Sequence, residues 1–186
     1  MEEITKDIQL KELTVSEFRS PDFSYYIPQT LIKLDLNISD FAIHYDISFP
    51  LTLVWLKIKI RGGIHVSLFE RMRELQRLKY LCIQGNFQTL KLGDAIGGLD
   101  TLEELEYDLV SSYELDRSVI PINVKKLVLG NTMGGKIKLH NAHLKEVRVL
   151  NKKYMHTFDC AIDVLYVYAG YDQLIPKTVK KVVFWH

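Results

Sequence analysis

The sequence predicts an α/β fold in which about nine short repeating units form a solenoid, each giving one strand to a parallel sheet. Two regularities predict this fold. The pattern apolar-x-x-apolar-x-apolar recurs at intervals of 17 to 25 residues, and four of the five prolines precede it at the same offset. Because no linker or low-complexity tract interrupts the series, we expect residues 1–186 to form a single domain.

The repeating pattern marks one strand in each unit. Its alternation of apolar and other residues is typical of a short strand with one face turned inward. A unit of about 20 residues cannot bury its own apolar side, so neighbouring units have to stack and pair their strands in parallel. From the first unit to the last, the inward positions are Leu10/Leu13/Val15, Leu31/Leu34/Leu36, Leu53/Leu56/Ile58, Leu78/Leu81/Ile83, Leu102/Leu105/Tyr107, Val124/Leu127/Leu129, Leu144/Val147/Val149, Ile162/Leu165/Val167 and Val179/Val182/Phe184.

The prolines mark the corner that leads into a strand. Pro28, Pro50, Pro121 and Pro176 each stand three residues before the first inward position of a unit. Proline lacks an N–H group and holds its predecessor in an extended conformation, which suits a bend at the start of a strand. The residue before each proline is Ile27, Phe49, Ile120 or Ile175, and the residue two positions after it is Thr30, Thr52, Asn123 or Thr178. The sequence therefore predicts that one corner is built four times.

The segments that return from one strand to the next are short. The clearest helix is predicted over residues 67–77, within the longest interval, where Ser67 and Glu70 form a candidate capping box. Four apolar residues follow on one face of this helix, namely Leu68, Met72, Leu75 and Leu78. The last two intervals, of 18 and 17 residues, leave room only for extended or turn-like returns. We therefore expect a mostly irregular convex side with a few short helices.

Several units resemble a known repeat family. Residues 75–86, which run from Leu75 to Asn86, resemble a leucine-rich repeat with its asparagine three residues after the last apolar position. Residues 96–105 are similar to the linker-to-strand passage of many such repeats, and residues 120–131, with the proline corner, resemble the FNIP variant. Asn37, Asn131 and Asn151 fall at other positions in their units. The resemblance covers residues 8–184 and implies a curved solenoid with a concave parallel sheet that is used for protein recognition.

Composition and charge indicate the environment and exclude some partners. Lys plus Arg number 24 and Asp plus Glu number 23, so no net field favours nucleic acid or an anionic membrane. No run approaches the roughly 20 apolar residues of a membrane span, and the acidic start MEEITKDIQL differs from a signal peptide. Two distant cysteines, Cys82 and Cys160, suit a reducing compartment. We expect a soluble protein in the cytoplasm or another intracellular compartment.

The motifs that suggest chemistry are weak. Residues 130–136 (GNTMGGK) fit a phosphate-binding loop, but Ile137 stands where magnesium binding needs Ser or Thr. Carboxylates such as Asp159 and Asp163 stay solvated on an open ladder and lack the enclosing pocket that acid–base catalysis needs. Four residues have metal-like spacings but no further residue completes a coordination set: His140, His143, His156 and Cys160. We expect no enzyme activity, no cofactor and no metal.

The residues that do not point inward form three columns across the sheet, because successive side chains in a strand alternate between its two faces. The column before the middle one is Glu12, Lys33, Trp55, Tyr80, Glu104, Lys126, Glu146, Val164 and Lys181. The middle column is Thr14, Asp35, Lys57, Cys82, Glu106, Val128, Arg148, Tyr166 and Val183. The column after it is Ser16, Asn37, Lys59, Gln84, Asp108, Gly130, Leu150, Tyr168 and Trp185. Strands lie about 4.8 Å apart, so we expect neighbours in a column to touch.

The C-terminal end of these columns is the predicted partner-binding site. Its apolar and aromatic residues are Val164, Tyr166, Tyr168, Val183, Trp185 and Leu150. Such a patch on a solvated face usually marks an interface, with Tyr and Trp as the commonest anchors, unless a terminal extension, a flanking loop or further chain covers it. Trp55 and Tyr80, beside Lys57, form a second candidate binding surface.

These observations lead to two functional hypotheses. The first is a non-catalytic scaffold that binds another protein through the exposed sheet face, such as a substrate-recognition or host-targeting module. The alternative is small-molecule or glycan binding on the aromatic–basic platform of Trp55, Tyr80 and Lys57. The last strand, over residues 179–185, also offers an edge for self-association. We expect no nucleic-acid partner and no membrane partner.

Overall fold

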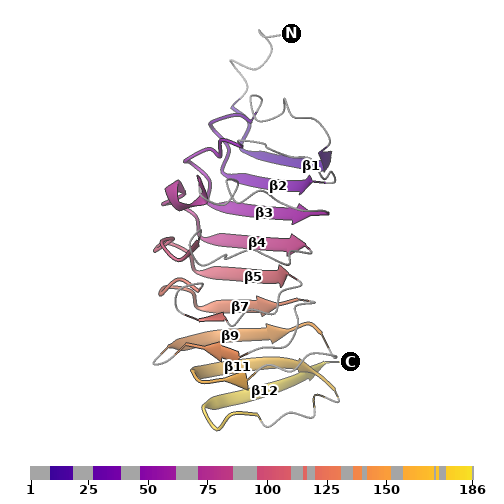
Figure 1. The fold of residues 1–186 in the computed structure, drawn as a ribbon, viewed down its shortest axis with the longest axis vertical. Coiled ribbons are helices and arrows are strands. Elements are labelled where there is room, and N and C mark those ends of the chain that lie inside the picture. Colours follow the sequence, from indigo (N-terminus) through magenta and orange to yellow (C-terminus); the bar gives the residue numbers. More distant parts are fainter. Residues whose placement is uncertain are drawn as a thin grey trace.

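A parallel sheet of nine strands runs the length of the molecule (Figure 1). The computed structural model describes residues 9–18, 27–38, 47–61, 71–85, 96–109, 115–116, 120–130, 136–139, 142–151, 157–169, 171 and 175–185. The strands of this main sheet are β1 (Glu12–Phe18), β2 (Lys33–Ile38), β3 (Trp55–Ile60), β4 (Tyr80–Gly85), β5 (Glu104–Leu109), β7 (Lys126–Leu129), β9 (His143–Val149), β11 (Ala161–Tyr168) and β12 (Val179–Trp185). They pair in chain order, so the chain forms a solenoid, as the repeat predicts.

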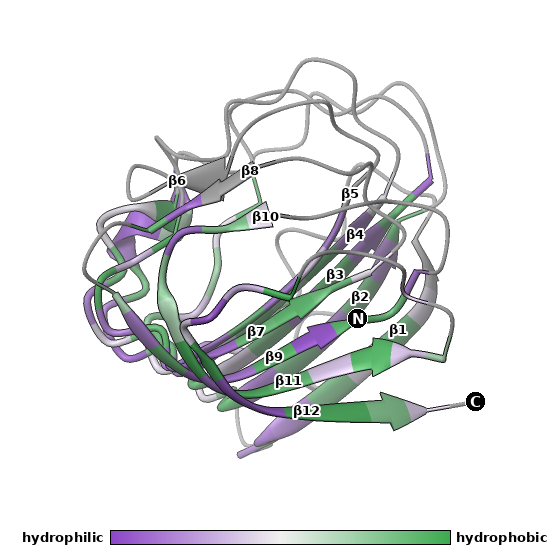
Figure 2. Cartoon of the chain, turned by 90° about the horizontal axis from the view of Figure 1, so that it is seen from below, coloured by the Kyte–Doolittle hydropathy of each residue, from purple (hydrophilic) through white to green (hydrophobic). Residues whose placement is uncertain are grey.

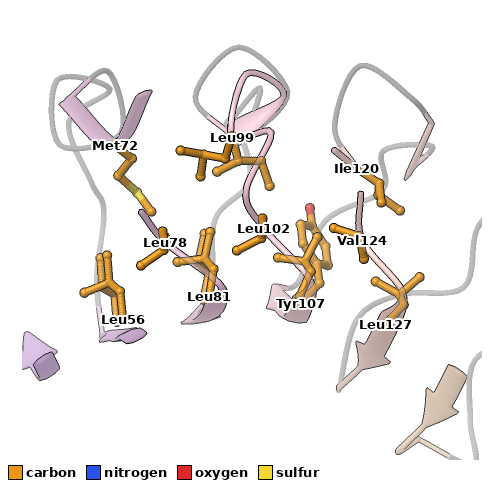
Figure 3. Packing of buried hydrophobic residues seen from close by; sticks show 14 of the residues in the cluster. Leu56, Met72, Leu78, Leu81, Leu99, Leu102, Tyr107, Ile120, Val124 and Leu127 are labelled. Atoms are coloured by element: carbon orange, nitrogen blue, oxygen red, sulfur yellow. The ribbon is translucent and has the colours of Figure 1, made fainter. Parts of the chain in front are cut away.

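The predicted inward positions form the core. In the seven inner units all three inward residues of each unit are buried, with exposed fractions of at most 4%. Figure 3 shows the strand residues Leu56 and Leu81 below Met72 and Leu99 of the return segments. It shows Leu127 in the same way below Val124 and Ile120. This burial confirms the predicted strand register, because a shift by one residue would turn every apolar side chain to the other face.

The two end units differ from the inner ones. Leu10, Leu13 and Val15 at one end are only partly buried. At the other end Val179 and Val182 are partly buried, and Phe184, which was expected to be buried, is 54% exposed. The expectation for Phe184 is wrong because no described strand lies beyond β12 to cover it.

The predicted proline corner is confirmed as a hydrogen-bonded turn. The carbonyl oxygens of Pro28, Pro50, Pro121 and Pro176 accept hydrogen bonds from the backbone N–H three residues later, at 3.0–3.3 Å. Units without proline build the same turn, since the Leu75 and Leu99 carbonyls accept from Leu78 and Leu102 at 3.0 Å. Because a β-turn of this kind tolerates most residues, proline is favoured at the corner but not required.

In four of the corners a side chain is hydrogen-bonded to the preceding unit. Thr52 Oγ1 donates to the carbonyl of Leu31 at 2.6 Å or to that of Gln29 at 2.9 Å. The corresponding residues of other units donate in the same way: Thr30 to Leu10, Thr101 to Leu78 and Asn123 to Asp100. The side chain at this position therefore connects neighbouring units. This explains why Thr or Asn recurs there, which the sequence pattern alone did not.

The side opposite the main sheet contains a second, smaller sheet, which was not predicted as a sheet from the sequence (Figure 2). The short strands β6 (Leu115–Asp116), β8 (Lys136–Lys138) and β10 (Thr157–Phe158) pair in parallel, in the order β10-β8-β6. They lie in the returns after β5, β7 and β9. Of these strands, β10 lies in the 18-residue interval and confirms the extended return predicted there. In the 17-residue interval the turn at Pro176 agrees with the same prediction.

Helix is nearly absent from the described residues, so the helical part of the expected α/β class is not confirmed. Within the helix predicted over residues 67–77, a 3₁₀ helix, η2 (Arg71–Glu74), ends before the corner at Leu75. The prediction is wrong at this end because residues 75–78 form the turn into β4. Met72, Leu75 and Leu78 are nevertheless buried, as expected. Leu68 and the candidate cap formed by Ser67 and Glu70 lie outside the described residues.

Candidate functional site on the outer face of the main sheet

The outer face of the main sheet, which points away from the core, carries the predicted columns, although a register shift between Val15 and Phe18 interrupts the third column at Ser16. The column from Glu12 to Lys181 is reproduced at every strand pair. The middle column, from Thr14 to Val183, is likewise continuous across all nine strands. Side chains that lie far apart in the sequence are therefore neighbours on this face, in the order that the repeat predicts.

At the N-terminal end of the outer face, one stack of side chains crosses four strands. Lys33 Nζ lies 3.1 Å from a Glu12 carboxylate oxygen and 5.2 Å from the centre of the Trp55 ring. On the next strand, the Tyr80 ring stacks on Trp55 with centroids 4.8 Å apart and planes 2° apart. Because Lys33 and Tyr80 come from the strands on either side of β3, they cover opposite faces of the Trp55 ring.

Tyr80 is held from its other end by a carboxylate. Its hydroxyl donates to Glu106 Oε2 at 3.0 Å, and Gln84 Nε2 donates to Glu106 Oε1 at 3.1 Å. Burial raises the pKa of the Tyr80 hydroxyl above its ordinary range, and the neighbouring Cys82 and Glu106 raise it further. The hydroxyl therefore remains a neutral hydrogen-bond donor near pH 7.

Cys82 is buried, although its place in the middle column predicts an exposed side chain. Its neighbours in the column are the longer side chains of Lys57 and Glu106, and Tyr80 bonds to Glu106 beside it. Burial raises the pKa of the Cys82 thiol above its ordinary value, and the Glu106 carboxylate adds to the rise. The thiol is therefore protonated near pH 7 and has little nucleophilic character.

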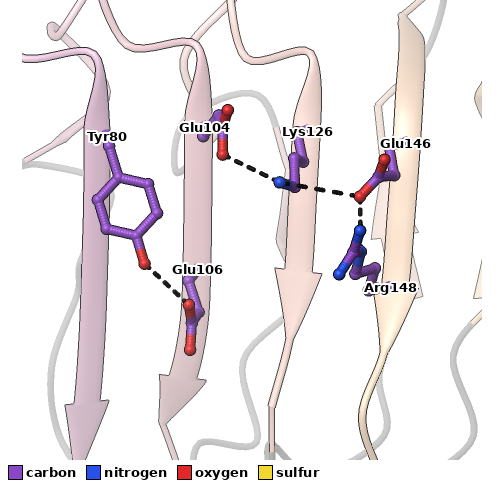
Figure 4. A network of polar contacts seen from close by, with 6 residues as sticks. All are labelled: Tyr80, Glu104, Glu106, Lys126, Glu146 and Arg148. Atoms are coloured by element: carbon purple, nitrogen blue, oxygen red, sulfur yellow. Dashed lines mark hydrogen bonds and ion pairs between the residues drawn. The ribbon is translucent and has the colours of Figure 1, made fainter.

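A chain of alternating charges occupies the centre of the outer face (Figure 4). Lys126 Nζ lies 3.2 Å from Glu104 and 3.9 Å from Glu146, and Arg148 Nε lies 2.6 Å from the same Glu146 carboxylate. The Arg148 guanidinium also covers the ring of Tyr166, 5.0 Å from its centre. Exposed ion pairs of this kind contribute only about 0–1 kcal/mol of stability each, but their pattern of charge can select a partner.

A groove of about 270 Å³ lies beside this chain of charges. It is lined by Tyr80, Glu104, Leu105, Glu106, Lys126, Val128, Arg148, Leu150 and Trp185. Val128 is the short residue of the middle column at this point, between the longer side chains of Glu106 and Arg148. Both predicted sets of binding residues contribute to the lining: Leu150 and Trp185 come from the C-terminal patch, and Tyr80 comes from the second candidate surface.

The predicted C-terminal patch forms, but its side chains partly cover one another. Val164, Tyr166, Tyr168, Val183, Trp185 and Leu150 are all half-buried. The rings of Tyr168 and Trp185 stack with centroids 4.8 Å apart and planes 28° apart. The Trp185 indole nitrogen, Nε1, is buried and has no hydrogen-bond partner among the described residues. Sequence reasoning therefore placed these residues together correctly and overestimated their exposure.

The groove also contains residues that were not predicted to be part of a site. Glu104, Glu106, Lys126, Val128 and Arg148 were predicted only as members of the exposed columns. The sequence feature that could have indicated the groove is a pair of small outward residues, Val128 and Gly130, in and directly after a strand whose neighbours carry long side chains. A Cβ atom at Gly130 would lie 2.3 Å from Asp108 Cγ, so the absence of a side chain there lets Asp108 occupy the space.

The candidate sites for chemistry are not assembled in the described residues. Asp163 Oδ1 lies 2.7 Å from both Lys180 Nζ and His143 Nε2 at the surface, and hydrogen bonds from Lys180 and then His143 lower the pKa of the Asp163 carboxyl. Asp159 Oδ1 instead accepts a hydrogen bond from the backbone N–H of Leu139 at 2.5 Å. His140, His156 and residues 131–135 of the glycine loop lie outside the described residues.

No cluster of three or more His, Cys, Asp or Glu side chains suited to a metal ion occurs within the described ranges. In the same part of the chain, no helix combines the length and apolar character needed to span a lipid bilayer. Comparison of the sequence with protein-family models and with curated proteins found no match.

Proposed function

We propose that this chain is a leucine-rich-repeat solenoid that acts as a non-catalytic interaction scaffold inside the cell and binds another protein through the outer face of its main sheet. The observation that carries the proposal is the groove beside Val128. It combines an apolar floor, aromatic residues at Tyr80 and Trp185, and flanking ion pairs. Protein interfaces have this composition, with aromatic and arginine anchors at the centre and a charged rim.

The repeat geometry supports membership of the leucine-rich-repeat family. Each unit supplies one short parallel strand, and the corner before it recurs in units with proline and in units with leucine. Proteins of this architecture present a continuous sheet face on which one column crosses many repeats, and this face suits an extended partner surface.

A non-catalytic role is supported by two observations. Cys82 is buried and neutral, and the carboxylates of Glu104 and Glu146 lie at the surface in ion pairs. Acid–base or nucleophilic catalysis needs a group whose pKa is poised near the working pH within an enclosed site. The pKa of the Cys82 thiol is instead raised away from this range, and Glu104 and Glu146 are engaged with Lys126 on an open face.

The alternative, glycan or small-molecule binding on Trp55, Tyr80 and Lys57, has weaker support. A sugar ring stacks on the free face of an aromatic ring, whereas Lys33 and Tyr80 cover the two faces of Trp55. This platform offers mainly ring edges. A glycan array probed with the purified chain is the direct measurement of this alternative.

The test of the proposal fills the groove and leaves the rest of the face unchanged. Val128→Lys introduces a long side chain at the groove floor, and Thr14→Lys makes the same kind of change in the same column on β1. Proteins captured from a cell lysate by each immobilised chain are identified by mass spectrometry, and the affinity of the captured partner is then measured.

We expect the partner to bind the wild-type chain and the Thr14→Lys variant, and Val128→Lys to lose more than about 2 kcal/mol of binding free energy, as for a central interface position. Circular dichroism spectra establish that both variants are folded. Equal binding by the two variants would rule out the groove as the binding site, and binding to glycans alone would favour the alternative.

A further inference from the structure

The two ends of the solenoid have complementary edges. From this complementarity we propose that the chain associates with further copies of itself head to tail, so that β12 of one copy pairs in parallel with β1 of the next. The proposed contact is between the edges of β12 and β1 and is distinct from the outer-face groove, to which β12 contributes Trp185.

Both ends leave inward-facing apolar residues incompletely covered. At the C-terminal end Val182 is half-buried and Phe184 is 54% exposed. Leu13 and Val15 at the N-terminal end are also only partly buried. The equivalent residues of every inner unit have exposed fractions of at most 4%. Stacking β12 on β1 would give each end the covering that an inner unit receives from its neighbour.

The charges of the two edge strands are opposite. The sequence of β1, ELTVSEF, contains two glutamates and no basic residue, whereas that of β12, VKKVVFW, contains two lysines and no acidic residue. Lys180 pairs with Asp163 on β11 at 2.7 Å, but Lys181 lies beside the apolar Val164 and has no ion-pair partner among the described residues.

The existing register places these charges together. Lys181 and Glu12 occupy the same column at opposite ends of the sheet, so a copy stacked in continuing register brings Lys181 beside Glu12. Glu12 would then lie between Lys181 and Lys33, an arrangement already present with the signs reversed where Lys126 lies between Glu104 and Glu146. In the same register Val182 meets Leu13, and Phe184 meets Val15.

The charge pattern selects this arrangement over back-to-back pairing of two β12 strands. A two-fold axis would make β12 antiparallel to its copy and place four lysines on one short interface. Like charges at close range oppose association. Head-to-tail stacking instead joins unlike surfaces, and such a heterologous contact forms an open series or a ring of copies.

Sedimentation velocity over a range of concentrations measures this association, with three charge variants. Lys181→Glu and Glu12→Lys each place like charges at the proposed contact. Lys145→Glu, on β9, is the matched control, because Lys145 is an exposed strand lysine away from both ends. Phe184→Ser tests the apolar part of the contact, and circular dichroism establishes the fold of each variant.

We expect the wild-type chain and Lys145→Glu to form species larger than a dimer as concentration rises. Lys181→Glu and Glu12→Lys should each need a roughly tenfold higher concentration to associate. Mixing these two variants should restore association, because the acidic end of one meets the basic end of the other. Phe184→Ser should weaken association, while Val128→Lys should leave it unchanged, which separates this contact from the proposed partner site.

A wild-type chain that remains monomeric over the whole range overturns the proposal. Association that ends at a dimer and is unaffected by Glu12→Lys also overturns it, since that result indicates pairing through β12 alone. Equal effects of Lys145→Glu and Lys181→Glu would also contradict it, because net charge and not the end contact would then control association.

Discussion

The burial of Cys82 shows how neighbouring strands determine the environment of one residue. The thiol is short, and Lys57 and Glu106 stand beside it in the middle column. Tyr80 completes the cover through its hydrogen bond to Glu106. A thiolate at this position would lose its hydration next to a carboxylate, so the folded protein retains the thiol proton to a higher pH than the unfolded chain does.

This difference in thiol pKa predicts how stability depends on pH. As the pH rises past about 8.5, the unfolded chain releases the Cys82 proton while the folded chain keeps it, so the free energy of unfolding falls by up to about 1.4 kcal/mol per pH unit. Urea unfolding between neutral and alkaline pH measures the slope. The Cys82→Ala variant should lose this part of the decline, and parallel curves for the two proteins would show that Cys82 is not its source.

At the scale of single elements, the corner is the unit of construction. Its position was predictable because proline constrains backbone geometry in a way that a sequence displays directly. The hydrogen bonds from Thr52 and its equivalents were not predictable, since they join residues 20 to 23 positions apart and depend on how the units stack. The small sheet of β6, β8 and β10 was missed for a similar reason, because strands of two or three residues have no periodicity to detect.

The corner hydrogen bonds lead to a prediction about stability. Thr52→Val removes the donor that bonds to the carbonyls of Gln29 and Leu31, and it should lower the free energy of unfolding by about 0.5–1.5 kcal/mol. Thr14→Val makes the same chemical change at an exposed strand position and should alter stability by less than about 0.5 kcal/mol. Urea denaturation of both variants gives the comparison, and equal losses would show that the corner bonds contribute nothing specific.

At the scale of the whole molecule, contacts follow chain order. Each strand of the main sheet pairs only with its sequence neighbours in that sheet, so the columns of the outer face could be read from the repeat. Exposure at the ends could not be read in this way. Phe184 fits the repeat as well as Tyr107 does, and only the absence of a described strand beyond β12 exposes it. The position of the groove could not be predicted from the repeat either, because the length and direction of the side chains determine where the face is hollow.

Dependence on neighbours predicts the behaviour of a shortened chain. Residues 1–98 retain β1 to β4 but lose β5, which covers Leu81 and Ile83 from one side. We expect this fragment to aggregate or to unfold in part. The backbone N–H and C=O groups on one side of β4 lose their partners, and the core residues that β5 covers become exposed. Size-exclusion chromatography and thermal melting of the fragment test this. A monomer that melts like the full chain would indicate two independently folding parts instead.

The sequential pairing of the strands also determines how the molecule would respond to mechanical force. The strands lie across the long axis with β1 and β12 at opposite ends, so the hydrogen bonds between them run along that axis (Figure 1). A pull applied through the two end strands loads these bonds in the direction in which they open, and each strand can separate before its neighbour is strained. Extension should therefore proceed by peeling from the ends in small steps, which would make this solenoid compliant along its axis.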